Sequence, residues 1–223
     1  MTKTILIDIE GTTTSLAFVH DVLFPYARKV LPDFIRRNQR EPAIKELLDA
    51  LRDQQKRYLT EQQIIDVLMQ WMDEDRKDII LKALQGHVWQ AGYAAGDFTG
   101  HVYPDAAEQL RAWHARGIKL YIFSSGSVAA QKLLFSFSDF GDLTPLFSGY
   151  FDTRIGSKRE AGAYKKIADE IGEPAAGILF LSDIIEELNA ARAVGMRTTQ
   201  LIRADQPAGD HAVAHSFSEI IPE

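Results

Sequence analysis

Short apolar segments recur along the chain, and stretches with helical spacing separate most of them. The candidate strands are residues 5–7, 118–123, 147–153, 178–181 and 196–202. Short apolar runs are typical of strands buried on both faces of a parallel sheet. A helical pattern from Pro104 to Gly117 precedes the second of these strands, and Pro and Gly are common at the start and end of helices. The alternation predicts an α/β core domain with a Rossmann-like parallel sheet.

Residues 17–97 show only helical spacing, although they lie between the first predicted strand and the rest of the sheet. Apolar side chains recur three or four positions apart at Ile44, Leu47, Leu48 and Leu51, at Ile64, Leu68, Trp71 and Met72, and at Ile80, Leu84 and Val88. We therefore assign residues 1–16 and 98–223 to the α/β core and residues 17–97 to an inserted helical domain. Taken alone, such an insert is a helical bundle with no role beyond packing.

Local signals refine the boundaries of the insert. Thr60 stands three residues before Gln63, which is the signature of a capping box at a helix start. Pro25 and Pro32 are expected to kink or restart the first helix, because proline lacks the N–H that a helix interior needs. Trp89 is expected to have a packing role, in a core or at the seam of the insert.

Glycines mark the exit from the insert, and polar residues fill the end of the chain. Gly92, Gly96 and Gly100 predict a hinge or linker. Residues 203–215 are polar and contain Pro and Gly, so we expect a surface loop, while residues 217–221 are expected to pack back on the core.

Composition excludes several kinds of site. The chain has 223 residues, a formal net charge of −6 and no Cys. A net negative charge argues against nucleic acid as the main partner, since phosphate backbones bind basic surfaces. Without Cys there are no disulfides, thiolate metal sites or thiol nucleophiles. No apolar run is long enough to cross a membrane, and the first residues do not resemble a signal peptide, so we expect no membrane association and a cytoplasmic protein.

The first predicted strand ends in two acids, Asp8 and Glu10, followed by Gly11 and three Thr residues. Ligands of open α/β sheets bind beyond the carboxyl ends of strands, so both acids would lie at the mouth of a site. Two carboxylates this close repel each other unless a cation or a phosphate-handling task uses them. The alternative is a solvated loop with chance acids, and this segment alone does not decide between the two.

Other strand ends also carry polar groups. Ser124 and Ser125 follow the strand at 118–123 and precede a predicted helix, an arrangement that favours anions. Asp183 follows the strand at 178–181, and Glu187 comes one helical turn later, where it would support a metal site. Lys158 lies in a loop between these ends. Taken singly, the serine turn is a common feature and Lys158 is a solvated lysine.

The stretch Asp8-Ile-Glu10-Gly-Thr-Thr resembles the first motif of the haloacid dehalogenase-like (HAD) phosphohydrolases, and the polar residues from Asp8 to Glu187 follow the order of that superfamily's four motifs. Most members have Asp where this chain has Glu10. A Glu at that position, together with residues 84–105 and 151–164, is similar to the enolase-phosphatase (acireductone synthase) branch. The resemblance implies a HAD-like core in which the helical insert is a cap over the substrate.

The resemblance also implies a role for each motif residue. Asp8 would be the nucleophile that forms an aspartyl-phosphate, and Glu10 the general acid and base. Lys158 would be catalytic and balance charge between Asp8 and the phosphate. The remaining roles are substrate binding by Ser124, Ser125 and Lys158, and binding of one Mg²⁺ per chain by Asp8, Glu10 (through its backbone carbonyl) and Asp183.

The implied substrate is a small-molecule phosphate ester, 2,3-diketo-5-methylthiopentyl-1-phosphate, which is enolised and then dephosphorylated to the acireductone of methionine salvage. A plain HAD-type phosphatase without enolase activity and a non-catalytic protein that kept the fold are the alternatives. A monomer is expected from the resemblance. Glu10, His20 and His87 are open candidates for the base that removes the carbon-bound proton, and the role of His101 is undecided.

Overall fold

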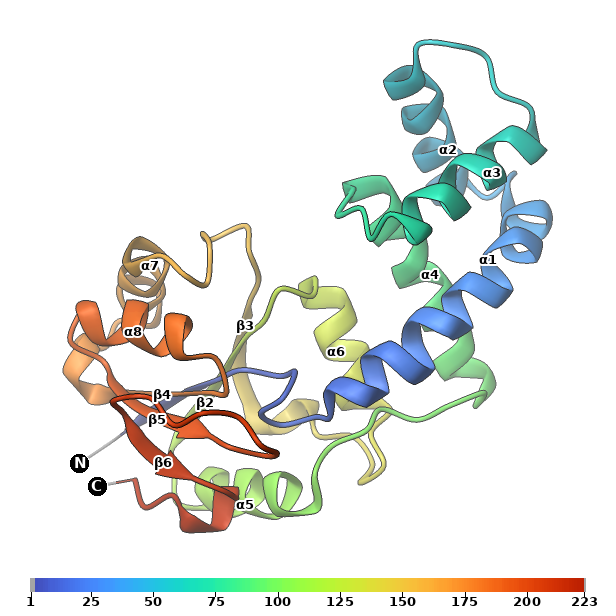
Figure 1. Ribbon diagram of the computed structural model, residues 1–223. Helices are drawn as coiled ribbons and strands as arrows, with labels where there is room; N and C mark the ends of the chain where they lie inside the picture. Colours follow the sequence, from blue (N-terminus) through green and yellow to red (C-terminus); the bar gives the residue numbers. More distant parts are fainter. Residues whose placement is uncertain (1–2, 223) are drawn as a thin grey trace. The chain divides into compact units, whose positions relative to one another are not determined.

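The strand that ends in the acid pair lies at the centre of the sheet. The computed structural model describes residues 3–222, in which β1 (Thr4–Ile7) pairs with β2 (Lys119–Phe123) on one side and β4 (Ile178–Ser182) on the other. The six strands are all parallel, in the order β3-β2-β1-β4-β5-β6 (Figure 1). The outer strands are β3 (Phe147–Phe151), β5 (Arg197–Leu201) and β6 (Ala212–Ala214). The predicted α/β class and parallel sheet are confirmed.

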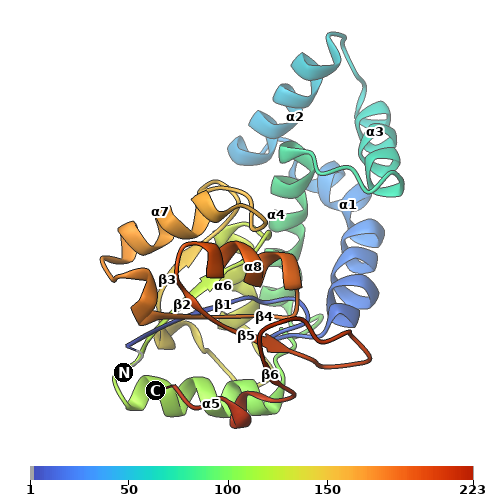
Figure 2. The ribbon, with the colours of Figure 1, turned by 60° about the vertical axis from the view of Figure 1, so that its left-hand side comes forward.

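Helices cover both faces of this sheet. Along one face run α7 (Ala161–Ile171) and α8 (Ile185–Ala193), which pack on a core that includes Leu6, Phe123 and Phe180. The opposite face carries α5 (Pro104–Ala115), as the two views in Figures 1 and 2 agree. Its fully buried Trp113 packs on Phe217 at a ring-centroid distance of 5.6 Å. The remaining elements are α6 (Val128–Ser136) and the 3₁₀ turns η2 (Thr144–Leu146), η3 (Ala175–Gly177) and η4 (Phe217–Glu219).

The chain divides into two compact units. One contains the chain up to Leu16 and from Thr99 onward, and the other is Ala17–Phe98. The second unit is helical, with a π-helix η1 (Phe18–Leu23) followed by α1 (Phe24–Asn38), α2 (Pro42–Gln55), α3 (Glu61–Asp73) and α4 (Ile79–Ala95). These helices enclose a hydrophobic core of their own, in which Leu31, Leu51 and Leu68 are fully buried. The unit thus satisfies its apolar faces internally.

Two local predictions for the insert are confirmed. The capping box forms, with the Gln63 amide donating to Thr60 Oγ1 at 3.3 Å and the Thr60 amide to Gln63 Oε1 at 3.0 Å. Trp89 packs against the insert's core and donates its indole N–H to the Leu23 carbonyl at 2.9 Å.

Two others are wrong in part. Pro32 lies inside α1 without restarting it, because the buried Leu31 and Ile35 keep the helix packed on both sides of it. Gly92 is not a hinge: it lies inside α4, where Tyr26 and Phe98 pack so closely that a Cβ would come within 2.8 Å of both rings. Gly96, by contrast, ends α4 with φ +74°.

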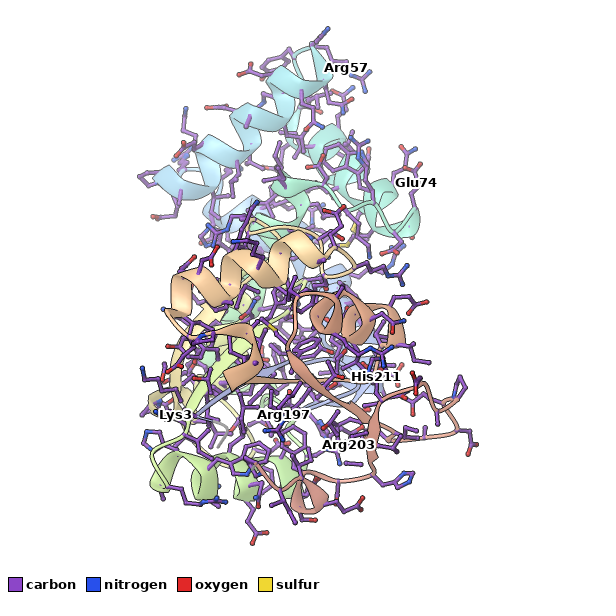
Figure 3. All side chains as sticks on the ribbon, turned by 90° about the vertical axis from the view of Figure 1, so that its left-hand side faces the viewer. Lys3, Arg57, Glu74, Arg197, Arg203 and His211 are labelled. Atoms are coloured by element: carbon purple, nitrogen blue, oxygen red, sulfur yellow. The ribbon has the colours of Figure 1, made fainter. Side chains whose placement is uncertain are left out.

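The segment 203–215 is not simply a surface loop. Residues 212–214 form β6, and the side chain of Arg203 is only 10% exposed. Figure 3 labels Arg203 and His211 on these C-terminal segments. The polar composition of this segment gave no sign of the strand or of the buried arginine. A strand of only three residues is too short to show an apolar alternation in the sequence. Residues 217–221 were predicted to pack on the core. This holds for Phe217 and Ile220, which are buried, and is wrong for Ile221, which is 75% exposed.

Candidate active site

The turn after β1 is held tightly around Asp8. The Asp8 side chain is buried, and the Ile9 carbonyl accepts the amides of Thr12, Thr13 and Thr14 at 2.9–3.2 Å. Gly11 has φ +78°, and a Cβ there would lie 2.3 Å from Asp183 Oδ2. Glycine is therefore required twice at this position, for the backbone conformation and for the approach of the Asp183 carboxylate.

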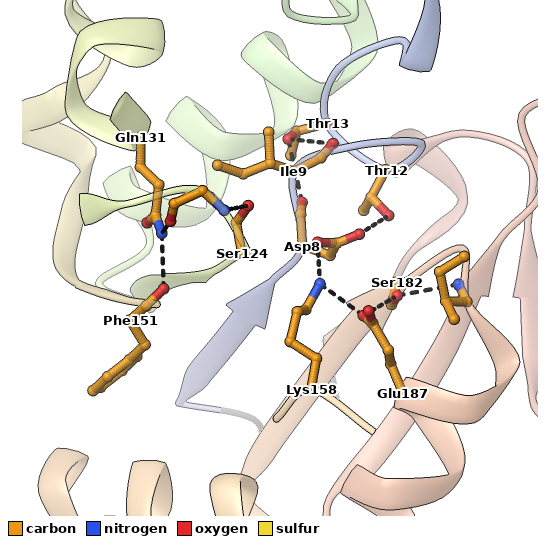
Figure 4. A network of polar contacts seen from close by, with 12 residues as sticks. Asp8, Ile9, Thr12, Thr13, Ser124, Gln131, Phe151, Lys158, Ser182 and Glu187 are labelled. Carbon is orange, nitrogen blue, oxygen red and sulfur yellow. Dashed lines mark hydrogen bonds and ion pairs between the residues drawn. The ribbon is translucent and has the colours of Figure 1, made fainter. Parts of the chain in front are cut away.

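Lys158 lies between two carboxylates. Its ammonium is 2.5 Å from Asp8 Oδ1 and 2.7 Å from Glu187 Oε2, and all three side chains are buried (Figure 4). Burial acts to lower the pKa of Lys158, but Asp8 and Glu187 together raise it above its ordinary value. Lys158 is consequently a fixed positive charge beside Asp8.

Side chains behind Lys158 orient it. The Tyr164 hydroxyl donates to the Lys158 carbonyl at 2.7 Å, and Ser182 Oγ donates to Glu187 Oε2 at 3.0 Å. Burial and the neighbouring Asp8 raise the pKa of Glu187 despite its contact with Lys158. The loop that carries Lys158 is therefore anchored to both α7 and α8.

Asp183 follows β4 at the same edge of the sheet. It is 6% exposed, and its Oδ1 has no hydrogen-bond partner among the described residues. Burial, and then the charge of Asp8, raise the pKa of Asp183 to about 7. A buried carboxylate oxygen without a donor is costly unless a cation compensates it.

The residues at this edge fit a hard divalent cation. In the described part of the chain no three His, Asp or Glu side chains group into a closed metal cage. The side chains available are Asp8 and Asp183, so a cation held here would complete its shell with backbone carbonyl oxygens, water and substrate. Mg²⁺ binds in this way, through one or two carboxylates plus water and phosphate oxygens.

The turn after β2 lies next to Asp8 in the sheet, since β1 and β2 are parallel neighbours. Ser124 is buried and its Oγ accepts the Gly126 amide at 3.1 Å, whereas Ser125 is exposed. Two amides at the start of α6 are already bound within the protein: Val128 N donates to Asp152 Oδ2 and Ala130 N to Ser127 Oγ, both at 3.2 Å. A bound anion would thus rely on the Ser124–Ser125 end of the turn more than on the helix start.

Two residues that sequence reasoning missed shape this turn. Gln131 is buried in α6 and donates to the carbonyls of Gly126 and Phe151 at 2.8 Å each. Figure 4 draws its contact with Phe151. Asp152 is also buried, although the exposed Arg154 pairs with it at 2.8 Å. Asp152 lies directly after the observed strand β3, but the predicted strand at 147–153 included it and hid this position. A Gln inside a helix gave no signal.

Glu10 and His101 lie on the two segments that connect the sheet unit with the helical unit, Glu10 before the helical unit and His101 after it. Glu10 is half-buried and forms an isolated bridge with Thr14. The Ser15 amide donates to His101 Nδ1 at 3.2 Å, and Thr14 Oγ1 lies 3.1 Å from the same atom. Nδ1 of His101 is thus the acceptor for the Ser15 amide. His101 thereby links the segment that leads into the helical unit, at Thr14 and Ser15, to the segment that returns from it.

Comparison with known proteins places the chain among phosphatases. A family model described as haloacid dehalogenase-like hydrolase matches residues 2–195. Enolase-phosphatase E1 of Erwinia tasmaniensis is 58% identical over 216 residues, which cover 96% of this chain and 93% of that protein. The enzyme of the same name from Pseudomonas aeruginosa is 53% identical over 222 residues and covers 99% of both chains.

Solved structures share the architecture. The UTR4 protein (Unknown transcript 4 protein) of Saccharomyces cerevisiae superimposes with a TM-score of 0.85 at 34% identity, covering 99% of this chain and all of that one. The L-2-haloacid dehalogenase of Xanthobacter autotrophicus has a TM-score of 0.56 at 19% identity, over 92% of this chain and 80% of that one. The second likeness concerns the fold alone.

Proposed function

The chain belongs to the enolase-phosphatase E1 family of haloacid dehalogenase-like hydrolases, and we propose that its substrate is 2,3-diketo-5-methylthiopentyl-1-phosphate. The product would be the acireductone 1,2-dihydroxy-3-keto-5-methylthiopentene of methionine salvage. The predicted family, fold and enzyme class are confirmed. The observation that carries the proposal is the buried Asp8 at the end of the central strand, with the Lys158 ammonium 2.5 Å from its carboxylate.

Asp8 is the proposed nucleophile. One of its carboxylate oxygens bonds to phosphorus while the bond from phosphorus to the ester oxygen breaks, and Glu10 gives the leaving oxygen a proton. Water then attacks the aspartyl-phosphate, Glu10 takes a proton from that water, and Asp8 is released with inorganic phosphate. Covalent catalysis of this kind divides one difficult displacement into two easier ones.

Charge and position support this chemistry. Lys158 opposes the negative charge that gathers when a phosphate approaches Asp8, and Ser124 with Ser125 would hold the transferring group. Positioning and electrostatic stabilisation provide most of the rate in phosphoryl transfer. Replacing Lys158 is therefore expected to lower turnover sharply.

The family implies a divalent metal, and we take it to be one Mg²⁺ per chain. Asp8 and Asp183 would hold it with their carboxylates and Glu10 with its backbone carbonyl. When bound, this cation supplies charge neutralisation and Lewis acidity toward the diketone. The observation that favours a cation here is the Oδ1 of Asp183, which is buried and has no hydrogen-bond partner within residues 3–222.

The helical unit is the proposed cap, and Phe18 and Phe24 on it are the proposed contacts for the methylthio end. Glu10, His20 and His87 stay open as the base for enolisation. A monomeric state, a cytoplasmic location and the absence of nucleic-acid partners stay predictions. No helix within residues 3–222 combines the length and apolarity needed to cross a membrane.

The test is a paired assay with the diketone phosphate and Mg²⁺ that follows enol absorbance and phosphate release together. We expect enol to appear before phosphate in the wild type. Asp8→Asn should abolish phosphate release, because an amide oxygen is a poor nucleophile.

Two outcomes would contradict the proposal. Phosphate release from simple esters with an untouched diketone would indicate a plain HAD-type phosphatase. Wild-type phosphate release by Asp8→Asn would exclude the covalent mechanism.

A further inference from the structure

Arg203 is nearly buried and engages partners on three sides. Its Nη1 donates to both oxygens of Asp105, at 3.0 and 2.9 Å. Nε and Nη2 donate to the Thr12 carbonyl at 3.2 and 3.0 Å. The guanidinium carbon lies 4.2 Å from the centroid of the Tyr103 ring and 5.4 Å from that of Phe217. Nη1 also donates to the His215 carbonyl at 3.5 Å. A planar fork fixed by three hydrogen-bonded groups and two rings has little freedom to move.

Thr12 belongs to the turn that carries the proposed nucleophile. Its hydroxyl donates to Asp8 Oδ2 at 3.4 Å, and the preceding residue, Gly11, lies against the Asp183 carboxylate. The adjacent Thr13 carbonyl accepts the Tyr103 amide at 2.9 Å. Arg203 and Tyr103 therefore hold two backbone carbonyls of the turn, while the Thr12 side chain contacts Asp8.

The contacts of Arg203 exceed what its ion pair requires. Asp105 lies in the first turn of α5 and also accepts the Phe217 amide at 2.7 Å, so it has a structural role that does not involve Arg203. An Arg–Asp pair with side chains 10% and 24% exposed loses much of its hydration, which makes it a weak means of gaining stability. The two remaining donors converge on one backbone oxygen, which is a way to fix the position of a loop.

From these contacts we propose that Arg203 is a positioning residue, which sets the Asp8 turn from behind without touching the substrate. This inference rests on the proposed role of Asp8. A displacement of about 1 Å at a reacting group can lower a rate roughly 100-fold. The expected consequence of losing Arg203 is thus a lower kcat with a nearly unchanged KM.

The test compares Arg203→Ala and Arg203→Lys with Asp105→Asn and Arg192→Ala. Lysine can donate to Thr12 or to Asp105 but lacks the fork that reaches both at once. Arg192 is the matched control, an arginine of the same unit that is 45% exposed and bonds Asn189 and Asp210. Each variant is assayed with Mg²⁺ on the diketone phosphate and on p-nitrophenyl phosphate, below the onset of its thermal unfolding.

We expect Arg203→Ala to lose about 100-fold in kcat, Arg203→Lys to fall between it and the wild type, and Arg192→Ala to match the wild type. Asp105→Asn keeps the donors to Thr12, so it should lower the melting temperature as much as Arg203→Lys while losing less kcat. A kcat loss that only follows the melting temperature across the variants would overturn the inference, as would a wild-type kcat in Arg203→Ala. If the wild type acts on p-nitrophenyl phosphate alone, the proposed substrate fails and the comparison of variants still stands.

Discussion

Asp183 shows at the scale of one residue how burial prepares a site for a cation. Its folded-state pKa of about 7 lies well above the usual value of a free aspartate. Without metal, the folded protein keeps a proton that the unfolded chain releases near pH 4, so this group's contribution to stability falls as pH rises toward 7. The ionised form, which a metal requires, is populated mainly above pH 7.

Mg²⁺ should accordingly stabilise the protein more at pH 8 than at pH 5.5. Between these values the apparent affinity should fall by up to roughly tenfold per pH unit below 7, because one proton must leave for one cation to bind. Melting temperatures at several Mg²⁺ concentrations and two pH values measure this dependence.

Asp152→Asn is the control for that experiment. Asp152 is another buried carboxylate. Burial acts to raise its pKa, but Arg154 and the amides of Val128 and Arg154 outweigh that effect and bring the pKa below the usual range. The Asp152→Asn variant should keep the pH dependence of the Mg²⁺ effect on the melting temperature. The Asp183→Asn variant should lose that pH dependence. An equal Mg²⁺ shift at both pH values would contradict the assignment of Asp183.

The sequence identified the candidate site residues better than it identified the residues that hold them in position. Asp8 stands directly after a buried apolar run and Asp183 one residue beyond another, and such positions can be recognised without a structure. Gln131 and Arg203 stand in a helix and in a polar segment, where either residue would ordinarily be solvated. Their partners, the Phe151 and Thr12 carbonyls, are backbone atoms far away along the chain, and backbone acceptors leave no mark in a sequence.

Helix α4 shows what a glycine does at the scale of an element. Apart from its chain neighbours and the adjoining backbone of α4, no atom of residues 3–222 lies within 4 Å of a Cβ added at Gly86. A Cβ at Gly92 would lie 2.6 Å from Phe98 and 2.8 Å from Tyr26. The Tyr26 ring packs edge-on against Phe98 at 4.8 Å, and its hydroxyl donates to Asp97 at 2.6 Å. A glycine at position 92 lowers the helix propensity of α4, but it leaves the space that the Tyr26 and Phe98 rings occupy.

The two glycines should respond oppositely to alanine. Gly86→Ala should raise the free energy of unfolding by up to about 1 kcal/mol, through better helix propensity. Gly92→Ala should lower it by about 1–3 kcal/mol, because the added methyl overpacks the two rings. Denaturant unfolding followed by circular dichroism compares them, and a gain in both variants would show that the rings give way easily.

The same element explains why spacing rules failed there. Gly92, Gly96 and Gly100 follow one another at intervals of four, and by sequence they are equivalent signals of a linker. Only the packing of residues close to Gly92 in space distinguishes it from Gly96, which ends the helix. The apolar periodicity of the sequence was enough to predict the helix. The role of each glycine depends on residues that are close to it only in the folded structure.

At the scale of the whole molecule, two units have separate cores and only one carries the proposed metal site. The core of Ala17–Phe98 is made of side chains from α1 to α4, while Asp8 and Asp183 belong to the unit with the sheet. A ligand stabilises only the states that bind it, by about 2.7 kcal/mol at a hundredfold excess over its Kd. Coupling between the units decides whether that free energy reaches the helical unit.

Amide hydrogen exchange with and without Mg²⁺ measures this coupling in the unaltered protein. We expect Mg²⁺ to slow exchange in β1, β2 and β4 and to leave the buried faces of α1 to α4 unchanged, because each unit can open with its own core. Asp183→Asn should show no slowing anywhere, which separates metal binding from a general salt effect. If α1 to α4 gain as much protection as the sheet, the two units open together, and the helical insert depends on the metal site for its stability.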